Sequence, residues 1–231
     1  MTNSDSAPLP AAGRTDDATE DCGLSLRQQA TAAIAAFTAV GQLPQLREAL
    51  TDGLDVGLTI SEINEILVQM YAYAGFPRSL NGIATSMALV DERRAKGISD
   101  PAGRQPTPLP GGTDILQLGT DNQTRLVGAP VTGALFGFAP AVDQFLKTHL
   151  FGDIFARDNL DWTSRELATV AALAGLEGVE SQLQSHIGIA LNTGLTESNL
   201  HALVTVLRAR IGQAPADRAH DALDKVLAAK R

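Results

Sequence analysis

Two side chains suited to proton transfer, Glu166 and His186, lie in the C-terminal half of the sequence. An imidazole titrates near neutral pH, so it can act as a general acid or base, and a carboxylate beside it can tune that chemistry. The helical period places His186 on an apolar face with Leu183, Ile187 and Ala190. The ring is therefore expected to be partly buried. The alternative is a core histidine that is satisfied by a neighbouring carbonyl or carboxylate.

Two roles are open for Glu166. Thr163, Ser164, Arg165 and Glu166 have the form of a capping box, which predicts a helix start at Thr163 with the Glu166 carboxylate on the first amides. The same carboxylate lies at the edge of an apolar stripe, from which it can reach a histidine on a neighbouring helix. The position of Glu166 alone does not separate these two roles.

Arg157 and Arg165 lie close to this region. An arginine can clamp a carboxylate through two parallel hydrogen bonds. Most arginines at helix entrances are simply solvated, so the sequence leaves both possibilities open. Trp162, the single tryptophan, is expected to pack at the entrance to the second half of the chain.

The helices that would position these groups belong to a duplicated pattern. An offset of 137 residues superimposes the stretch 45–70 on the stretch 182–207. Each copy reads as a helix, a glycine stop, a threonine start and a second helix. The identical pairs are Gln45/Gln182, Leu46/Leu183, Leu54/Leu191, Gly57/Gly194, Leu58/Leu195, Thr59/Thr196 and Ser61/Ser198. His186 stands where the first copy has Ala49, so only the second copy carries the histidine.

Composition and periodicity predict an all-α fold. Apolar residues make up 44% of the chain, charged residues 19% and aromatic residues only 4%, and no segment shows the alternation of a strand. We expect a disordered or extended arm over residues 1–24 and a first helical unit over 25–96. A linker rich in proline and glycine is predicted over 97–138, followed by a second helical unit over 139–231.

Several functional classes are disfavoured. The net charge of -8, without clustered lysine and arginine, disfavours nucleic acid as a partner. The single cysteine, Cys22, allows no disulfide within the chain, and no histidine or cysteine spacing predicts a metal site. The first 22 residues lack the basic start and apolar run of a signal peptide, so none is expected, and no apolar segment approaches the ~20 residues that span a bilayer. A cytoplasmic protein with no membrane partner is expected.

Three segments carry a family resemblance: FGDIFARDNLDWTSRELATVAALAGL over 151–176, QLQSHIGIALNTGLT over 182–196 and QMYAYAGFPRSLNG over 69–82. Together they resemble the carboxymuconolactone decarboxylase family. The resemblance implies a duplicated alkylhydroperoxidase D-like helical bundle, with two tandem units in one chain. Since such units commonly assemble into rings, it also implies a homo-oligomer.

The peroxidase branch of this fold carries a glutamate, a Cys-x-x-Cys motif and a histidine. Glu166 and His186 match the outer members, whereas the two cysteine positions are Val179 and Gln182. Thiol-based peroxide reduction needs a peroxidatic thiolate and a resolving partner. The resemblance therefore disfavours a thiol peroxidase.

The decarboxylase branch implies a lyase that acts on a small carboxylated lactone or a related acid. His186 would donate the proton, Glu166 would hold and tune the imidazole, and Arg157 or Arg165 would anchor a substrate carboxylate. Tyr73 and Asn81 would complete the site from the first unit or from a neighbouring chain. No metal or organic cofactor is implied. The alternative is a non-catalytic helical scaffold, or a small-molecule-binding protein, that retains the family fold.

Overall fold

The computed structural model describes residues 23–230, which contain helices and no strand. The first five helices are α1 (Leu26–Val40), α2 (Leu43–Asp55), α3 (Ile60–Gln69), α4 (Tyr71–Ala74) and α5 (Phe76–Ala95). The last four are α9 (Trp162–Gly175), α10 (Glu180–Asn192), α11 (Glu197–Arg210) and α12 (Gln213–Ala229). Between them lie α6 (Ile115–Val127), α7 (Ala134–Phe138), α8 (Pro140–Phe145) and the π-helix η1 (Leu146–Ile154). The predicted all-α class is confirmed.

The duplication inferred from the sequence is present in the helices. The offset of 137 residues that relates the two repeats carries the first residues of α2, α3 and α5 onto the first residues of α10, α11 and α12. The glycine stops also match, because Gly57 has φ +88° and Gly194 has φ +109°, both in the left-handed region. The chain therefore contains two copies of one helical unit.

A capping box stands at the start of the third helix in each unit, at the threonine that the repeat predicts as a helix start. The Thr59 hydroxyl accepts a hydrogen bond from the Glu62 amide, and the Glu62 carboxylate accepts one from the Thr59 amide. Thr196 and Asn199 make the same reciprocal pair before α11. Both helix starts predicted at these threonines are confirmed.

The capping box predicted at Thr163 is wrong. Asp161 caps α9 instead, because its carboxylate accepts a 2.8 Å hydrogen bond from the Ser164 amide. The Thr163 hydroxyl donates to the Thr193 carbonyl of the next helix. Since α9 begins at Trp162, Glu166 lies beyond the first turn. Its carboxylate does not cap the helix and points into the bundle.

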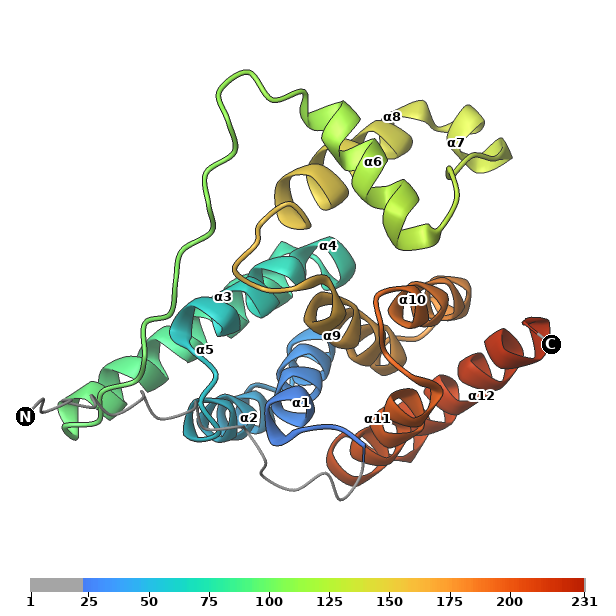
Figure 1. The fold of residues 1–231 in the computed structure, drawn as a ribbon. Coiled ribbons are helices and arrows are strands. Elements are labelled where there is room, and N and C mark those ends of the chain that lie inside the picture. Colours follow the sequence, from blue (N-terminus) through green and yellow to red (C-terminus); the bar gives the residue numbers. More distant parts are fainter. Residues whose placement is uncertain (1–22, 231) are drawn as a thin grey trace, which may run out of the picture.

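The two units share a core at the contact between α1 and α9 (Figure 1). Ala32 and Ala36 of α1 belong to the same apolar cluster as Val170 and Leu173 of α9. A second cluster joins other alanines of α1 to Ala168 and Ala172. Small side chains let the two helices approach closely, so neither unit buries its apolar surface independently of the other.

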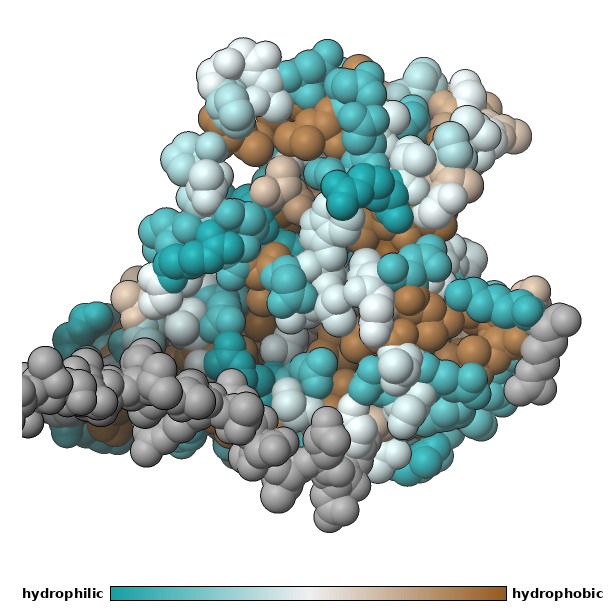
Figure 2. Space-filling view, in the orientation of Figure 1, coloured by the Kyte–Doolittle hydropathy of each residue, from teal (hydrophilic) through white to brown (hydrophobic). Residues whose placement is uncertain are grey.

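A third group of helices forms the lobe drawn above the two units in Figure 1, where α6 packs on η1. A Cβ atom at Gly119 of α6 would lie 1.7 Å from the Lys147 carbonyl oxygen, so the close packing depends on glycine. The segment 97–138, predicted as a linker, therefore contains a 13-residue helix. Figure 2 shows apolar residues among the polar ones on this lobe, where Leu116 is 45% exposed.

The predicted N-terminal arm lies almost wholly outside the described residues, as does Cys22. Leu24, at the end of that arm, is fully buried in the core. Among the described residues, no helix is long and apolar enough to cross a membrane. The unit boundaries at residues 25–96 and 139–231 stay predictions.

Candidate acid–base site

Helices α9 and α10 bring Glu166 and His186 together. The Nδ1 atom of His186 lies 2.8 Å from Oε2 of Glu166. Glu166 is completely buried, and His186 is 9% exposed. Of the two roles open for Glu166 in the sequence, the structure places its carboxylate on the histidine rather than on the first amides of α9.

The contact fixes which ring nitrogen can meet a ligand. An ionised Glu166 accepts a hydrogen bond from the Nδ1–H group of His186, and Nε2 is then the nitrogen available for proton exchange with a ligand. The imidazole side chain keeps 11% of its surface exposed, so the ring reaches the edge of the bundle. The other carboxylate oxygen, Oε1, is buried and has no hydrogen-bond partner among the described residues. Within the described residues, the Glu166 carboxylate therefore makes its one hydrogen bond, through Oε2, to the imidazole.

Tyr73 of α4 covers the pair from the first unit. Its ring meets the imidazole of His186 edge-on, with 5.4 Å between centroids and an interplanar angle of 81°. Its hydroxyl is buried and has no hydrogen-bond partner among the described residues. Burial, and then the charge of Glu166, raise the pKa of Tyr73. The phenol therefore stays protonated at neutral pH.

Arg165 points to the opposite side of α9, where it is fully buried. Its guanidinium donates hydrogen bonds of 3.0 Å to Glu65 and 3.1 Å to Gln69, both on α3. A third hydrogen bond, of 2.9 Å, goes to the Arg157 carbonyl. Burial lowers the pKa of Arg165, and the Glu65 carboxylate opposes that change. The guanidinium is thus occupied within the protein and is not presented to the outside.

Arg157 binds the same carboxylate of Glu65 through two nitrogens, at 2.7 and 2.9 Å, and keeps 40% of its side chain exposed. Burial alone would raise the pKa of Glu65. Hydrogen bonds from Arg157, Arg165 and Asn159 outweigh that effect and hold the Glu65 pKa below its usual value. Two arginines from the second unit therefore enclose one buried carboxylate from the first.

The structure does not bring every predicted site residue to the acid–base pair. Asn81 is exposed on α5, and none of its side-chain atoms hydrogen-bonds to Glu166 or His186 in the described chain. Val179 is the residue before α10 and Gln182 lies in its first turn, at the two positions where a peroxidase would carry cysteines. Within residues 23–230, no three His, Cys, Asp or Glu side chains gather in a way that would hold a metal ion.

Glu65 and Gln69 were not predicted as partners of the site. They stand four residues apart on α3 and meet Arg165 and Thr169, which stand four residues apart on α9. Polar residues at that spacing, with the apolar residues ILV between them, are a sequence signal for such a contact. The signal does not name the partner helix.

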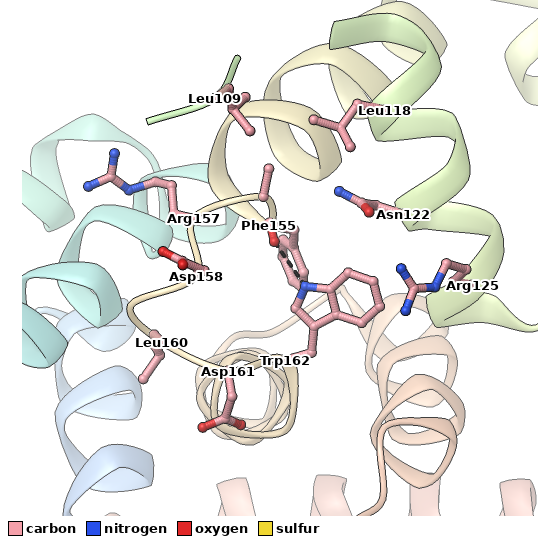
Figure 3. A pocket seen from close by; sticks show the side chains of 11 residues that line it. Leu109, Leu118, Asn122, Arg125, Phe155, Arg157, Asp158, Leu160, Asp161 and Trp162 are labelled. Carbon is pink, nitrogen blue, oxygen red and sulfur yellow. Dashed lines mark hydrogen bonds between the residues drawn. The ribbon is translucent and has the colours of Figure 1, made fainter. Parts of the chain in front are cut away.

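A cavity of about 390 Å³ lies at the N-terminal end of α9 (Figure 3). It is bounded by the chain near Leu109, by α6 and by the connection from η1 to α9. The guanidinium carbon of Arg125 lies 4.9 Å from the centre of the Trp162 ring, whose Nε1 donates to the Phe155 carbonyl at 2.9 Å. Neither His186 nor Glu166 is among the residues that line this cavity.

A helical bundle of two copies, with a glutamate–histidine pair in the second copy, is what the family resemblance implies. The model of the carboxymuconolactone decarboxylase family matches residues 9–85 and 140–225. The chain therefore belongs to the carboxymuconolactone decarboxylase family, and the two matched regions agree with the two tandem units. No curated protein matches the chain.

Proposed function

We propose that the protein is a carboxymuconolactone decarboxylase-like lyase that acts on a small carboxylated lactone or a related acid, with His186 as the proton donor. The observation that carries this proposal is the 2.8 Å contact between the buried Glu166 and the partly exposed His186. A carboxylate that orients an imidazole while leaving Nε2 available is the arrangement that general acid catalysis requires.

The proposed reaction breaks the bond between the substrate carboxylate carbon and the lactone ring. The electron pair of that bond passes into the unsaturated lactone, and carbon dioxide leaves. The ring carbon that holds the resulting electron density then takes a proton from Nε2 of His186, and solvent restores that proton. Glu166 stabilises the imidazolium before the transfer, and the protonated Tyr73 closes one side of the imidazole.

We assign different roles to the two arginines. Arg157 is paired with Glu65 through two nitrogens and lines the cavity that neither Glu166 nor His186 lines, so we assign it a role in fixing Glu65 and no direct contact with the substrate. Arg165 is fully buried and paired with Glu65. This supports a positioning role, in which the pair holds α9, and with it Glu166, in place. Asn81 is exposed on α5 and has no role in this proposal.

Decarboxylation of carboxymuconolactone, followed by ultraviolet absorbance, tests the proposal. We expect His186→Gln to lower kcat by about 100-fold or more, the usual contribution of a positioned general acid. His220→Gln is the matched control, because His220 lies on α12 with 47% of its side chain exposed. Equal rates for wild type and His186→Gln would remove His186 from the mechanism. A folded wild type without turnover of this substrate or related acids would favour the non-catalytic scaffold.

We also propose that the chain forms a homo-oligomer in the cytoplasm. Leu135, Phe138 and Phe145 of α7 and α8 are 68%, 90% and 64% exposed, and apolar side chains gathered in this way are typical of association surfaces. Light scattering coupled to size-exclusion chromatography tests this: a mass of 24.2 kDa at all concentrations would contradict it.

A further inference from the structure

We propose that the cavity at the N-terminal end of α9 is a second binding site, which takes a small, flat carboxylate with Arg125 as its anionic anchor. The inference goes beyond the proposed reaction, because the acid–base pair does not line this cavity. It depends on three observations: the apolar wall, the bonding of the charged side chains around it, and the way in which Arg125 is held.

The wall of the cavity is mainly apolar and comes from three parts of the chain. Its apolar side chains are Leu109, Leu118, Phe155, Leu160 and Trp162. Figure 3 shows them around one hollow, with Leu118 and Arg125 both on α6. A cavity of about 390 Å³ lies at the lower end of the range for small-molecule sites, so it suits a compound with a single ring.

Four charged side chains line the cavity, and three of them are used within the protein. Arg157 binds Glu65. Asp158 accepts hydrogen bonds from Thr107 and pairs with Arg104, and Asp161 caps α9. Arg125 makes no hydrogen bond or ion pair through its side chain within residues 23–230. Among the charged side chains that line the cavity, Arg125 is therefore the one whose donors stay available within the described residues, and a cation of this kind beside an apolar wall suits an apolar anion.

The stacking of Arg125 on Trp162 prepares the guanidinium for a carboxylate. With its carbon 4.9 Å from the ring centre, the cation is held over the indole face. A stacked guanidinium keeps its N–H donors at its edge, where they can donate two parallel hydrogen bonds to one carboxylate. The indole is itself fixed by the Nε1 hydrogen bond to Phe155. The anchor is thus positioned before a ligand arrives.

Trp162 is the only tryptophan in the chain and lines this cavity, so the tryptophan fluorescence of the protein comes from the proposed site. Benzoate is the probe, with the neutral benzamide and the ring-free acetate as matched compounds at constant ionic strength. We expect a saturable change in fluorescence with benzoate, and much weaker binding of benzamide and acetate. Arg125→Gln is expected to weaken benzoate binding about tenfold or more, the loss that corresponds to hydrogen bonds with a charged group.

Two variants separate this site from the proposed reaction. Arg208→Gln removes one positive charge from an exposed position on α11 and should bind benzoate like the wild type. His186→Gln should also bind like the wild type, even though it lowers turnover. The affinity for benzoate, measured by isothermal titration calorimetry, checks that Arg125→Gln alters binding and not only the fluorescence of Trp162. Equal affinities for benzoate and benzamide, or equal affinities of Arg125→Gln and wild type for benzoate, would overturn the proposal.

Discussion

The two copies of the helical unit have matching helices but carry different polar side chains. Where the second unit has Glu166 and His186, the first has Gln29 and Ala49. Conversely, Glu65 and Gln69 of the first unit correspond to Ala202 and Val206 of the second. The second unit therefore carries the acid–base pair, and the first carries the buried carboxylate that holds Arg165.

This division explains why the units share a core. Glu166 follows Arg165 on α9, so the ionic contact between Arg165 and Glu65 also sets the position of Glu166. Tyr73 of the first unit covers the ring of His186 in the second. The first unit therefore helps to position the acid–base pair of the second unit, and the site depends on the contact between the two units.

The largest effect on stability is expected at the buried ion pairs between Glu65 of the first unit and the two arginines of the second. Glu65→Ala removes the carboxylate from the buried Arg165 and from Arg157, and breaking such a buried pair typically costs about 3–5 kcal/mol. Urea denaturation measures the change in the free energy of unfolding. Glu92→Ala is the control, because Glu92 pairs with Arg47 at the surface and its loss is worth about 1 kcal/mol or less. Equal losses for both variants would show that the buried pair does not join the units.

A smaller effect is expected at the matched helix starts. Thr59→Ala and Thr196→Ala each remove a capping hydroxyl, which typically costs about 1 kcal/mol. The loss should be greater at Thr59, because its partner Glu62 also binds Arg27 at 2.7 Å. Thermal unfolding of the two variants checks the order. A greater loss at Thr196 would contradict the added stabilisation that we assign to the pair between Glu62 and Arg27.

The smallest effect is expected in acid, at the loop before α9. Hydrogen bonds from Thr107 and Arg104 lower the pKa of Asp158 to about 2 from 3.8. Because the folded pKa is the lower one, the stabilisation is present above the unfolded pKa and is lost as the pH falls from about 4 to about 2. In Asp158→Asn, the urea midpoint of unfolding should decrease less steeply as the pH falls over that range. Asp224→Asn, at the exposed end of α12, should leave it unchanged. An unaltered pH profile in Asp158→Asn would contradict the assignment.

Local signals in the sequence were sufficient for most of the fold. Apolar periodicity, Gly57 and Gly194, and the threonine caps predicted the helices of both units because they act within a few residues. The same reasoning failed at Thr163, where Asp161 two residues earlier captures the Ser164 amide. It also predicted only a linker where the 13-residue helix α6 forms, because the packing of Gly119 on the Lys147 carbonyl is a tertiary contact in a segment rich in glycine and proline.

The candidate site shows the same limit. Periodicity placed His186 on an inward face, and the family resemblance paired it with Glu166. The position of Arg165 depends on Glu65, which lies 100 residues away, so no local pattern distinguishes a substrate clamp from a buried ion pair. Arg157, eight residues before it, binds the same carboxylate but stays partly exposed. Only the tertiary arrangement separates the two arginines.

The central claim is that Glu166 and His186 act as one acid–base unit. A double-mutant cycle on the decarboxylation of carboxymuconolactone tests it most directly, with Glu166→Gln, His186→Gln and the double variant. Residues that act through one another show strongly non-additive effects. We therefore predict that the double variant is about as slow as His186→Gln alone. Two effects that multiply would show that Glu166 and His186 act independently, and would contradict the account.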